Sequence, residues 1–63
     1  MKTNVGNLFR LNNRNSGLIV LTQVHKDGIE FMWIDSGLKG RTSRRIMLAW
    51  YRAGDLTPVV VKK

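Results

Sequence analysis

The sequence predicts a small, mainly β fold, or a small α+β fold, built on a strongly bent antiparallel sheet with one short C-terminal helix. Residues 18–25 and 29–34 are rich in β-branched, aromatic and other apolar side chains and flank Asp27-Gly28. That dipeptide is a strong hairpin signal, because a type I′ turn needs positive φ at both central positions. Residues 43–53 instead have apolar side chains at helical spacing. A chain of 63 residues is expected to form a single domain, 1–63.

A first strand is expected at residues 5–11, where Phe9 and Leu11 fall on one face because side chains alternate along a strand. Residues 12–17 (NNRNSG) are turn residues throughout. Asn and Gly tolerate positive φ, and Asn and Ser side chains bond to nearby backbone groups. The first strand should therefore end in a turn that leads into the hairpin, whose third strand ends at residues 35–37.

The register of the hairpin follows if Asp27-Gly28 is its two-residue loop, since His25 then faces Glu30 and Val24 faces Phe31. One face would then be apolar along its length, with Val20, Thr22, Val24, Ile29, Phe31 and Trp33. The other face would become apolar only at the end remote from the turn. A flat, one-sided sheet would not need this second apolar area, whereas a strongly bent sheet or a helix over one corner would.

A short helix is expected near residues 43–53, because Thr42 or Ser43 can cap its start and Gly54 suits the position just past its end. The side chains expected to face the sheet are Ile46, Ala49, Trp50 and Ala53. The alternative is a strand over residues 46–51 in a small barrel. Thr57-Pro58 should end the helical region, and residues 59–61 read as a short last strand.

A family resemblance is carried by VGNLFRL at residues 5–11, LIVL at 18–21, the Asp-Gly hairpin, and FMWI at 31–34. Over residues 5–38 this pattern resembles small SH3-like barrel modules of the KOW and Tudor kind. The resemblance implies an SH3-like barrel that binds RNA, DNA or another protein through loops and one exposed face. The predicted helix departs from the simplest version of that family, so no binding residue is transferred. In size and composition the chain also looks like the small basic proteins that bacteriophages encode.

The charge of the chain is strongly positive, with 11 Lys and Arg against 4 Asp and Glu and a net charge of +7. Residues 36–54 contain five of the cations and no acid. Such a surface attracts polyanions, nucleic acid first. The segment at residues 37–43 is expected to be a glycine-bounded loop that carries Lys39 and Arg41. It lacks the spacing of a phosphate-binding loop, but free N–H groups at a helix start beside these cations would make a phosphate clamp.

The leading functional hypothesis is therefore a non-enzymatic DNA- or RNA-binding module. The expected contacts are Lys39, Arg41, Arg44, Arg45 and Arg52, with Tyr51 as the most exposed aromatic residue and Arg10 and Arg14 extending the basic surface. Phe31, Trp33 and Trp50 are expected in the core, because so small a domain needs its large side chains inside. The alternative is a small regulator or inhibitor that binds an acidic surface of a host protein, for example a nucleic-acid-processing enzyme, through the same patch.

Other functional classes find little support in the sequence. It has no cysteine and one histidine, so neither a disulfide nor a metal or cofactor site is expected. His25 opposite Glu30 could act as a base with an orienting acid, but a surface pair is expected instead. No apolar run approaches the roughly 20 residues of a membrane span, and residues 1–7 do not resemble a secretory signal, so we expect a cytoplasmic protein that binds no membrane. A homodimer would be compatible with so limited a core.

Overall fold

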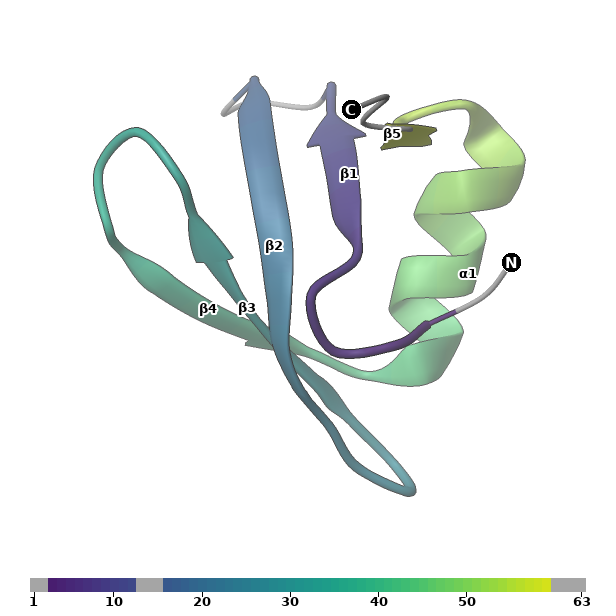
Figure 1. Cartoon of the computed structure of the whole chain (residues 1–63). Coiled ribbons are helices and arrows are strands. Elements are labelled where there is room, and N and C mark those ends of the chain that lie inside the picture. The colour runs from purple at the N-terminus through teal and green to yellow at the C-terminus, as the bar shows by residue number, and fades with distance from the viewer. Residues whose placement is uncertain (1–2, 13–15, 60–63) are drawn as a thin grey trace.

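The computed structural model describes residues 3–12 and 16–59. Within these residues it has five strands and one helix, drawn in Figure 1. They are β1 (Leu8–Leu11), β2 (Gly17–Val24), β3 (Ile29–Trp33), β4 (Lys39–Thr42), α1 (Arg44–Ala53) and β5 (Leu56–Val59). The strands form one antiparallel sheet in the order β4-β3-β2-β1-β5. The prediction of a mainly β fold with one short helix near the C-terminus is confirmed.

The sheet is not closed into a barrel, so the predicted SH3-like barrel is wrong as to closure. In the part of the chain described, β4 and β5 are the two edge strands, and no hydrogen-bonded ladder joins them. The helix α1 connects these two strands and runs beside the sheet (Figure 1). A ten-residue helix spans about 15 Å, and this connection begins directly after β4. The helix therefore takes the place of the pairing that would close a barrel.

Three strands differ from the prediction. The first strand, β1, covers Leu8–Leu11 rather than residues 5–11, because Val5 and Gly6 lie in a turn. Residues 39–42 form β4, although the segment at 37–43 was expected to be a loop, because its backbone completes the free edge of β3. The last strand covers Leu56–Val59 rather than residues 59–61, of which 60 and 61 lie outside the described residues. It contains Pro58, which an edge strand tolerates because the missing N–H need not bond to a second neighbour.

The hairpin of β2 and β3 has a different register from the predicted one. Val24 pairs with Ile29, and the turn is closed by a hydrogen bond of 2.8 Å from the His25 N–H to the Gly28 carbonyl oxygen. A bulge between Leu21 and Gln23 then shifts β2, so that Leu21 lies opposite Phe31. The predicted apolar face is therefore wrong at Val20 and Thr22, since Ile19 and Leu21 are the buried residues of β2, while Val20 lies opposite Met32 on the other side and Thr22 is exposed. A bulge bends the strand that carries it, and here it directs apolar residues from both halves of the hairpin to one core.

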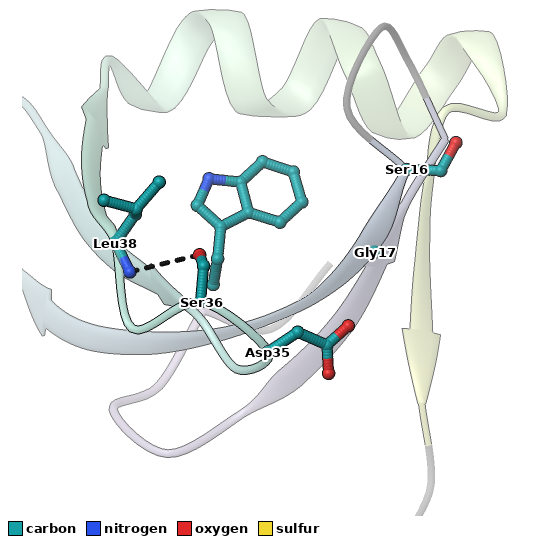
Figure 2. A pocket seen from close by; sticks show the side chains of 6 residues that line it. Ser16, Gly17, Asp35, Ser36 and Leu38 are labelled. Atoms are coloured by element: carbon teal, nitrogen blue, oxygen red, sulfur yellow. Dashed lines mark hydrogen bonds between the residues drawn. The ribbon is translucent and has the colours of Figure 1, made fainter.

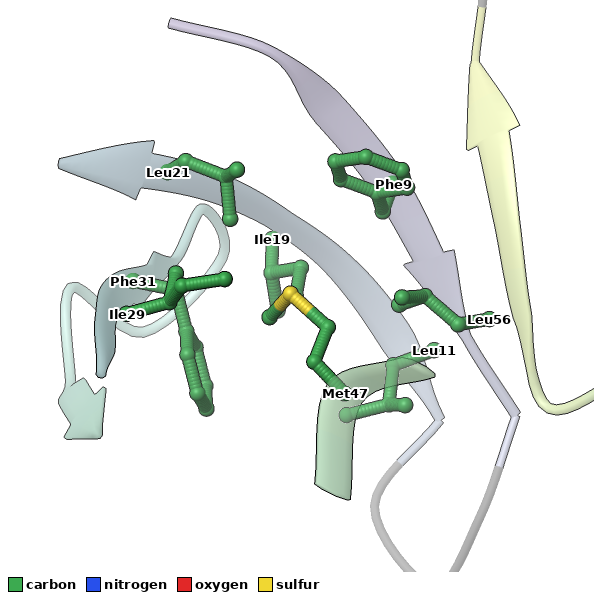
Figure 3. Close-up of a cluster of buried hydrophobic side chains, with 8 residues drawn as sticks. All are labelled: Phe9, Leu11, Ile19, Leu21, Ile29, Phe31, Met47 and Leu56. Carbon is green, nitrogen blue, oxygen red and sulfur yellow. The ribbon is translucent and has the colours of Figure 1, made fainter. Parts of the chain in front are cut away.

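The core lies between the sheet and α1 and is shown in Figure 3. Its buried residues are Phe9, Leu11, Ile19, Leu21, Ile29, Phe31, Met47 and Leu56. Phe31 is buried as predicted, whereas Trp33 and Trp50 are only partly buried and pack against the core from its margin. All the strands except β4 contribute to this core, and Met47 is the residue of α1 that enters it.

Both ends of α1 are capped as the sequence predicted. The Ser43 hydroxyl oxygen accepts a hydrogen bond of 3.1 Å from the Ile46 N–H. At the other end Gly54 has φ 84°, and the Asp55 N–H bonds to the Trp50 carbonyl oxygen at 2.9 Å. This is the Schellman arrangement, which satisfies carbonyl groups that the helix leaves free. The helix near residues 43–53 is confirmed, and the alternative strand over 46–51 is wrong.

The buried side of α1 differs from the predicted stripe. Met47 is fully buried, while Ile46 is 48% exposed and Ala49 and Ala53 are also exposed. Of the predicted stripe only Trp50 packs against the core. Neighbouring helical residues point about 100° apart, so the helix is turned by roughly one residue from the predicted orientation. The long, flexible side chain of methionine suits the irregular space between the bent strands.

The cross-strand pair of Phe31 and Gly40 leads to a stability prediction. A Cβ atom at Gly40 would lie 2.6 Å from two atoms of the Phe31 ring. We expect Gly40→Ala to lower the free energy of unfolding by about 1–3 kcal/mol, because the ring must move from its packed position. Urea denaturation followed by circular dichroism measures the change. Gly28→Ala is the matched control, since a Cβ atom there meets its nearest atoms at an ordinary 3.5 Å. Equal losses in the two variants would contradict the prediction.

Candidate nucleic-acid interface

Four of the predicted cations follow one another along the chain from β4 into α1, and we call them the basic track: Lys39, Arg41, Arg44 and Arg45. Lys39 and Arg41 alternate along β4 and therefore project from the same side of the sheet. Arg44 and Arg45 open α1 after the single intervening residue Ser43. All four side chains are exposed. The chain thus passes from the edge strand β4 into α1, and both elements carry two of these cations.

The charge of the basic track is not neutralised by a carboxylate within residues 3–12 and 16–59. The ion pair found there joins His25 and Glu30, not a residue of the track. Arg44 donates a hydrogen bond of 3.4 Å from Nη1 to the carbonyl oxygen of His25, which leaves its positive charge intact. Glu30 is paired across the strands with Arg41, but its carboxylate is hydrogen-bonded to His25. The track therefore presents exposed positive charge, although the Glu30 carboxylate lies close enough to Arg41 and Lys39 to feel their charges.

The two arginines at the start of α1 do not stabilise the helix. The first turn contains no acidic residue, and the N-terminal end of a helix dipole is positive. A cation there costs about 0.3–1 kcal/mol instead of stabilising the helix. Arg52, in contrast, lies in the last turn, where a cation is favourable. The helix therefore gains no stability from the charges of Arg44 and Arg45 through its dipole.

A hollow of about 260 Å³ lies beside these two arginines, and we call it the arginine hollow. It is lined by Thr3, Ile29, Arg44, Arg45 and Leu48. Guanidinium groups bind phosphate through two parallel N–H···O hydrogen bonds, so a recess between two of them suits a phosphate group. Thr3, Ile29 and Leu48 were not predicted as site residues. They come from three separate segments, and no local pattern of the sequence could have brought them together.

A second hollow, of about 370 Å³, lies where β3 ends and is shown in Figure 2. It is lined by Ser16, Gly17, Trp33, Asp35, Ser36 and Leu38. The Trp33 ring packs edge-on against Phe31, with ring centres 6.2 Å apart, and a Cβ atom at Gly17 would lie 3.3 Å from two of its atoms. Trp33 is therefore both a margin of the core and a wall of this hollow. The Asp35 carboxylate makes the hollow unsuitable for a phosphate.

The other predicted contact residues either lie away from the basic track or fall outside the described residues. Arg52 is exposed at the end of α1, and Tyr51 is 39% exposed. Arg10 is exposed on β1 between Leu18 and Thr57. It lies three strand positions from β4, about 14 Å at the usual strand spacing, so the structure separates it from the track. Arg14 lies outside the described residues.

His25 and Glu30 form a hydrogen-bonded pair at the surface. The His25 Nε2 and Glu30 Oε2 atoms are 2.5 Å apart, and both side chains are 39% exposed. The hydrogen bond from His25 lowers the pKa of Glu30, and the positive charges of Arg41 and Lys39 act in the same direction, while desolvation opposes them. The geometry is that of an exposed diagonal pair on the hairpin, because Gln23 and not His25 lies directly opposite Glu30.

The lowered pKa of Glu30 predicts a pH dependence of stability. A carboxyl group whose pKa is lower in the folded than in the unfolded chain stabilises the fold above the unfolded pKa. That contribution is lost as the pH falls through the folded pKa. We expect Glu30→Gln to reduce the acid-induced loss of stability, measured as unfolding midpoints between neutral and acidic pH. His25→Gln should act in the same direction, and an NMR titration placing the Glu30 pKa at its ordinary value would contradict the prediction.

The described residues contain neither a metal-binding cluster nor a membrane-spanning helix. Among residues 3–12 and 16–59, no three His, Asp or Glu side chains gather closely enough to hold a metal ion. The same part of the chain has no helix that is long and apolar enough to span a membrane. Comparison with protein-family models, with curated proteins and with solved structures found no match. The resemblance to KOW and Tudor modules stays a prediction.

Proposed function

We propose that this chain is a non-enzymatic nucleic-acid-binding module that holds the phosphate backbone along the basic track. One observation carries the proposal: four exposed cations follow one another from β4 into α1 with no carboxylate paired to them in the described residues. Arg44 and Arg45 would take one phosphate at the arginine hollow, while Lys39 and Arg41 contact its neighbours along β4. Such a module would act in the cytoplasm.

Contacts of this kind position the protein on the nucleic acid but do not distinguish bases. The basic track has no aromatic side chain among its members. We therefore propose binding with little dependence on base sequence. Tyr51 and Arg52 lie further along α1 and would add contacts only to a longer ligand.

Salt dependence tests the proposal directly. Each neutralised phosphate contributes a slope of about −0.7 for single strands or −0.9 for B-DNA to the plot of log affinity against log salt. Four contacts should then weaken binding by about 50-fold for a single strand and 150-fold for a duplex between about 50 and 200 mM salt. Fluorescence anisotropy with labelled DNA and RNA of two unrelated sequences measures this. Absence of binding at low salt, or an affinity that does not change with salt concentration, would refute the proposal.

The second candidate function is a regulator that docks the same patch on an acidic protein surface. Ile46 is 48% exposed next to Arg45, and an exposed apolar side chain contributes to a protein interface but not to phosphate binding. Affinity capture with and without nuclease separates the two functions. A stoichiometric protein partner that survives nuclease supports the regulator, and loss of the captured material on nuclease treatment supports nucleic-acid binding.

A further inference from the structure

The sheet has a second apolar surface on the side that faces away from the core. The strand registers place Met32, Val20, Leu8 and Val59 in one row across β3, β2, β1 and β5. Leu18 lies two residues before Val20 on β2 and projects from the same side. We call these five residues the outer apolar face. Each is partly exposed, whereas their neighbours Phe9, Ile19 and Phe31 project to the other side and are buried.

This surface is unusual for a sheet with one core. An antiparallel sheet with one solvated face normally alternates apolar and polar side chains. The helix that covers a face here is α1, and it packs on the inner one, since Met47 lies among the buried residues (Figure 3). A contiguous apolar patch on the solvated side is characteristic of an interaction surface. The outer apolar face is also separate from the arginine hollow, none of whose lining residues belongs to it.

The edge of the outer apolar face is positively charged. Arg10 lies next to Leu18, and Lys39 lies next to Met32 at the β4 side, with Arg41 beyond it. None of the three has a carboxylate partner in residues 3–12 and 16–59. Glu30 is on the same side of the sheet but is paired with His25. A partner that covers the apolar row should therefore bring carboxylates to its border.

We propose that the outer apolar face docks an amphipathic helix of another protein, with aliphatic side chains on one side and Asp or Glu along its flanks. The row crosses three strand spacings, about 14 Å, which is the length of a helix of roughly ten residues. A second copy of this chain fits less well, because it would bring an equally positive border and a further net charge of +7. Nucleic-acid bases would find no aromatic side chain among these five residues to stack on.

The experiment uses a fluorescent peptide of leucine and glutamate, with leucines at helical i, i+3, i+4 and i+7 positions and its helix held by a side-chain crosslink. A scrambled peptide of the same composition is the reference. We expect the helical peptide to bind at least about tenfold more tightly, and to shift the amide resonances of Leu8, Val20 and Met32 in two-dimensional NMR spectra. Val20→Thr combined with Met32→Thr should weaken binding by about tenfold or more, because the two residues form the centre of the row.

Ile46→Thr is the matched control, since it makes an exposed apolar residue of α1 polar and should leave peptide binding unchanged. If circular dichroism shows the double variant to be unfolded, Arg10→Glu replaces it, as this exposed residue lies only at the border of the face. It should also weaken binding by about tenfold.

Equal binding of the scrambled peptide, resonance shifts centred on α1, or no loss in the variants overturns the proposal. Concentration-dependent dimers that Val20→Thr abolishes would assign the face to a second copy instead. Binding to phosphatidylserine vesicles that needs Val20 would assign it to a membrane. Nucleic-acid binding through Arg44 and Arg45 is measured separately, so the two proposals can fail independently.

Discussion

Replacing Met47 with alanine is expected to unfold a large fraction of the protein under conditions in which the unchanged chain is folded. Met47 is the one fully buried residue that α1 contributes to the core. Truncating a buried methionine costs about 2–5 kcal/mol. Domains have about 0.05–0.15 kcal/mol of stability per residue, or roughly 3–9 kcal/mol for this length. Urea denaturation followed by far-ultraviolet circular dichroism gives the free energy of unfolding of both proteins.

The control is the neighbouring position, because the sequence pattern and the structure disagree there. Ile46→Ala removes a side chain that is 48% exposed and should cost less than about 1 kcal/mol. Both variants shorten one helical side chain to alanine, so helix propensity changes little between them. A large loss at Ile46 with a small loss at Met47 would mean that α1 packs through the stripe predicted from the sequence.

The double variant Arg44→Ala, Arg45→Ala is expected to weaken nucleic-acid binding by one to two orders of magnitude at low salt. Two phosphate contacts are lost, so the slope of log affinity against log salt should flatten by about 1.4 for single strands. The loss should be similar for unrelated sequences, since phosphate contacts carry no base information. Fluorescence anisotropy over a range of salt concentrations measures both the affinity and the slope. Helix stability should not fall, because both cations oppose the helix dipole.

The matched control is a second double variant that removes two positive charges outside the basic track. Arg10→Ala with Lys26→Ala removes two exposed cations, one from β1 and one from the hairpin turn. It should lower affinity only through the long-range field of the protein and leave the slope nearly unchanged. If both double variants reduce affinity and slope equally, binding depends on net charge, and the basic track is not the site.

Much of the fold could be predicted because the signals were local. Ser43 and Gly54 mark the helix ends through their own capping chemistry, and β2 and β3 are rich in residues that favour strands. Strand β4 could not be predicted, because Lys39–Thr42 has no strand pattern and is extended through pairing with β3. The bulge after Leu21 could not be predicted either, because it depends on how the whole hairpin bends over the core.

The spacing of apolar residues does not decide which side of α1 is buried. Ile46, Ala49 and Ala53 fit a helical stripe, but Met47 and Trp50 also lie three residues apart. The two choices differ by about one residue of rotation, and only the shape of the core decides between them. For the site, the sequence identified the basic segment but treated Lys39 and Arg41 as loop residues. It could not show that Arg10 lies apart from them or that Ile29 and Thr3 complete the arginine hollow.

The open edges of the sheet carry residues that discourage pairing with another chain. An edge strand presents free N–H and C=O groups, which another strand can extend into an aggregate. Lys39 and Arg41 protect β4 through their charge, and Pro58 protects β5 because it lacks an N–H group. If phosphates bind Lys39 and Arg41, they neutralise the charge that keeps β4 apart from other strands. Colloidal stability and ligand binding would then depend on the same two side chains, so crowding several copies on one polyanion would favour strand-to-strand association unless the polyanion also shields β4.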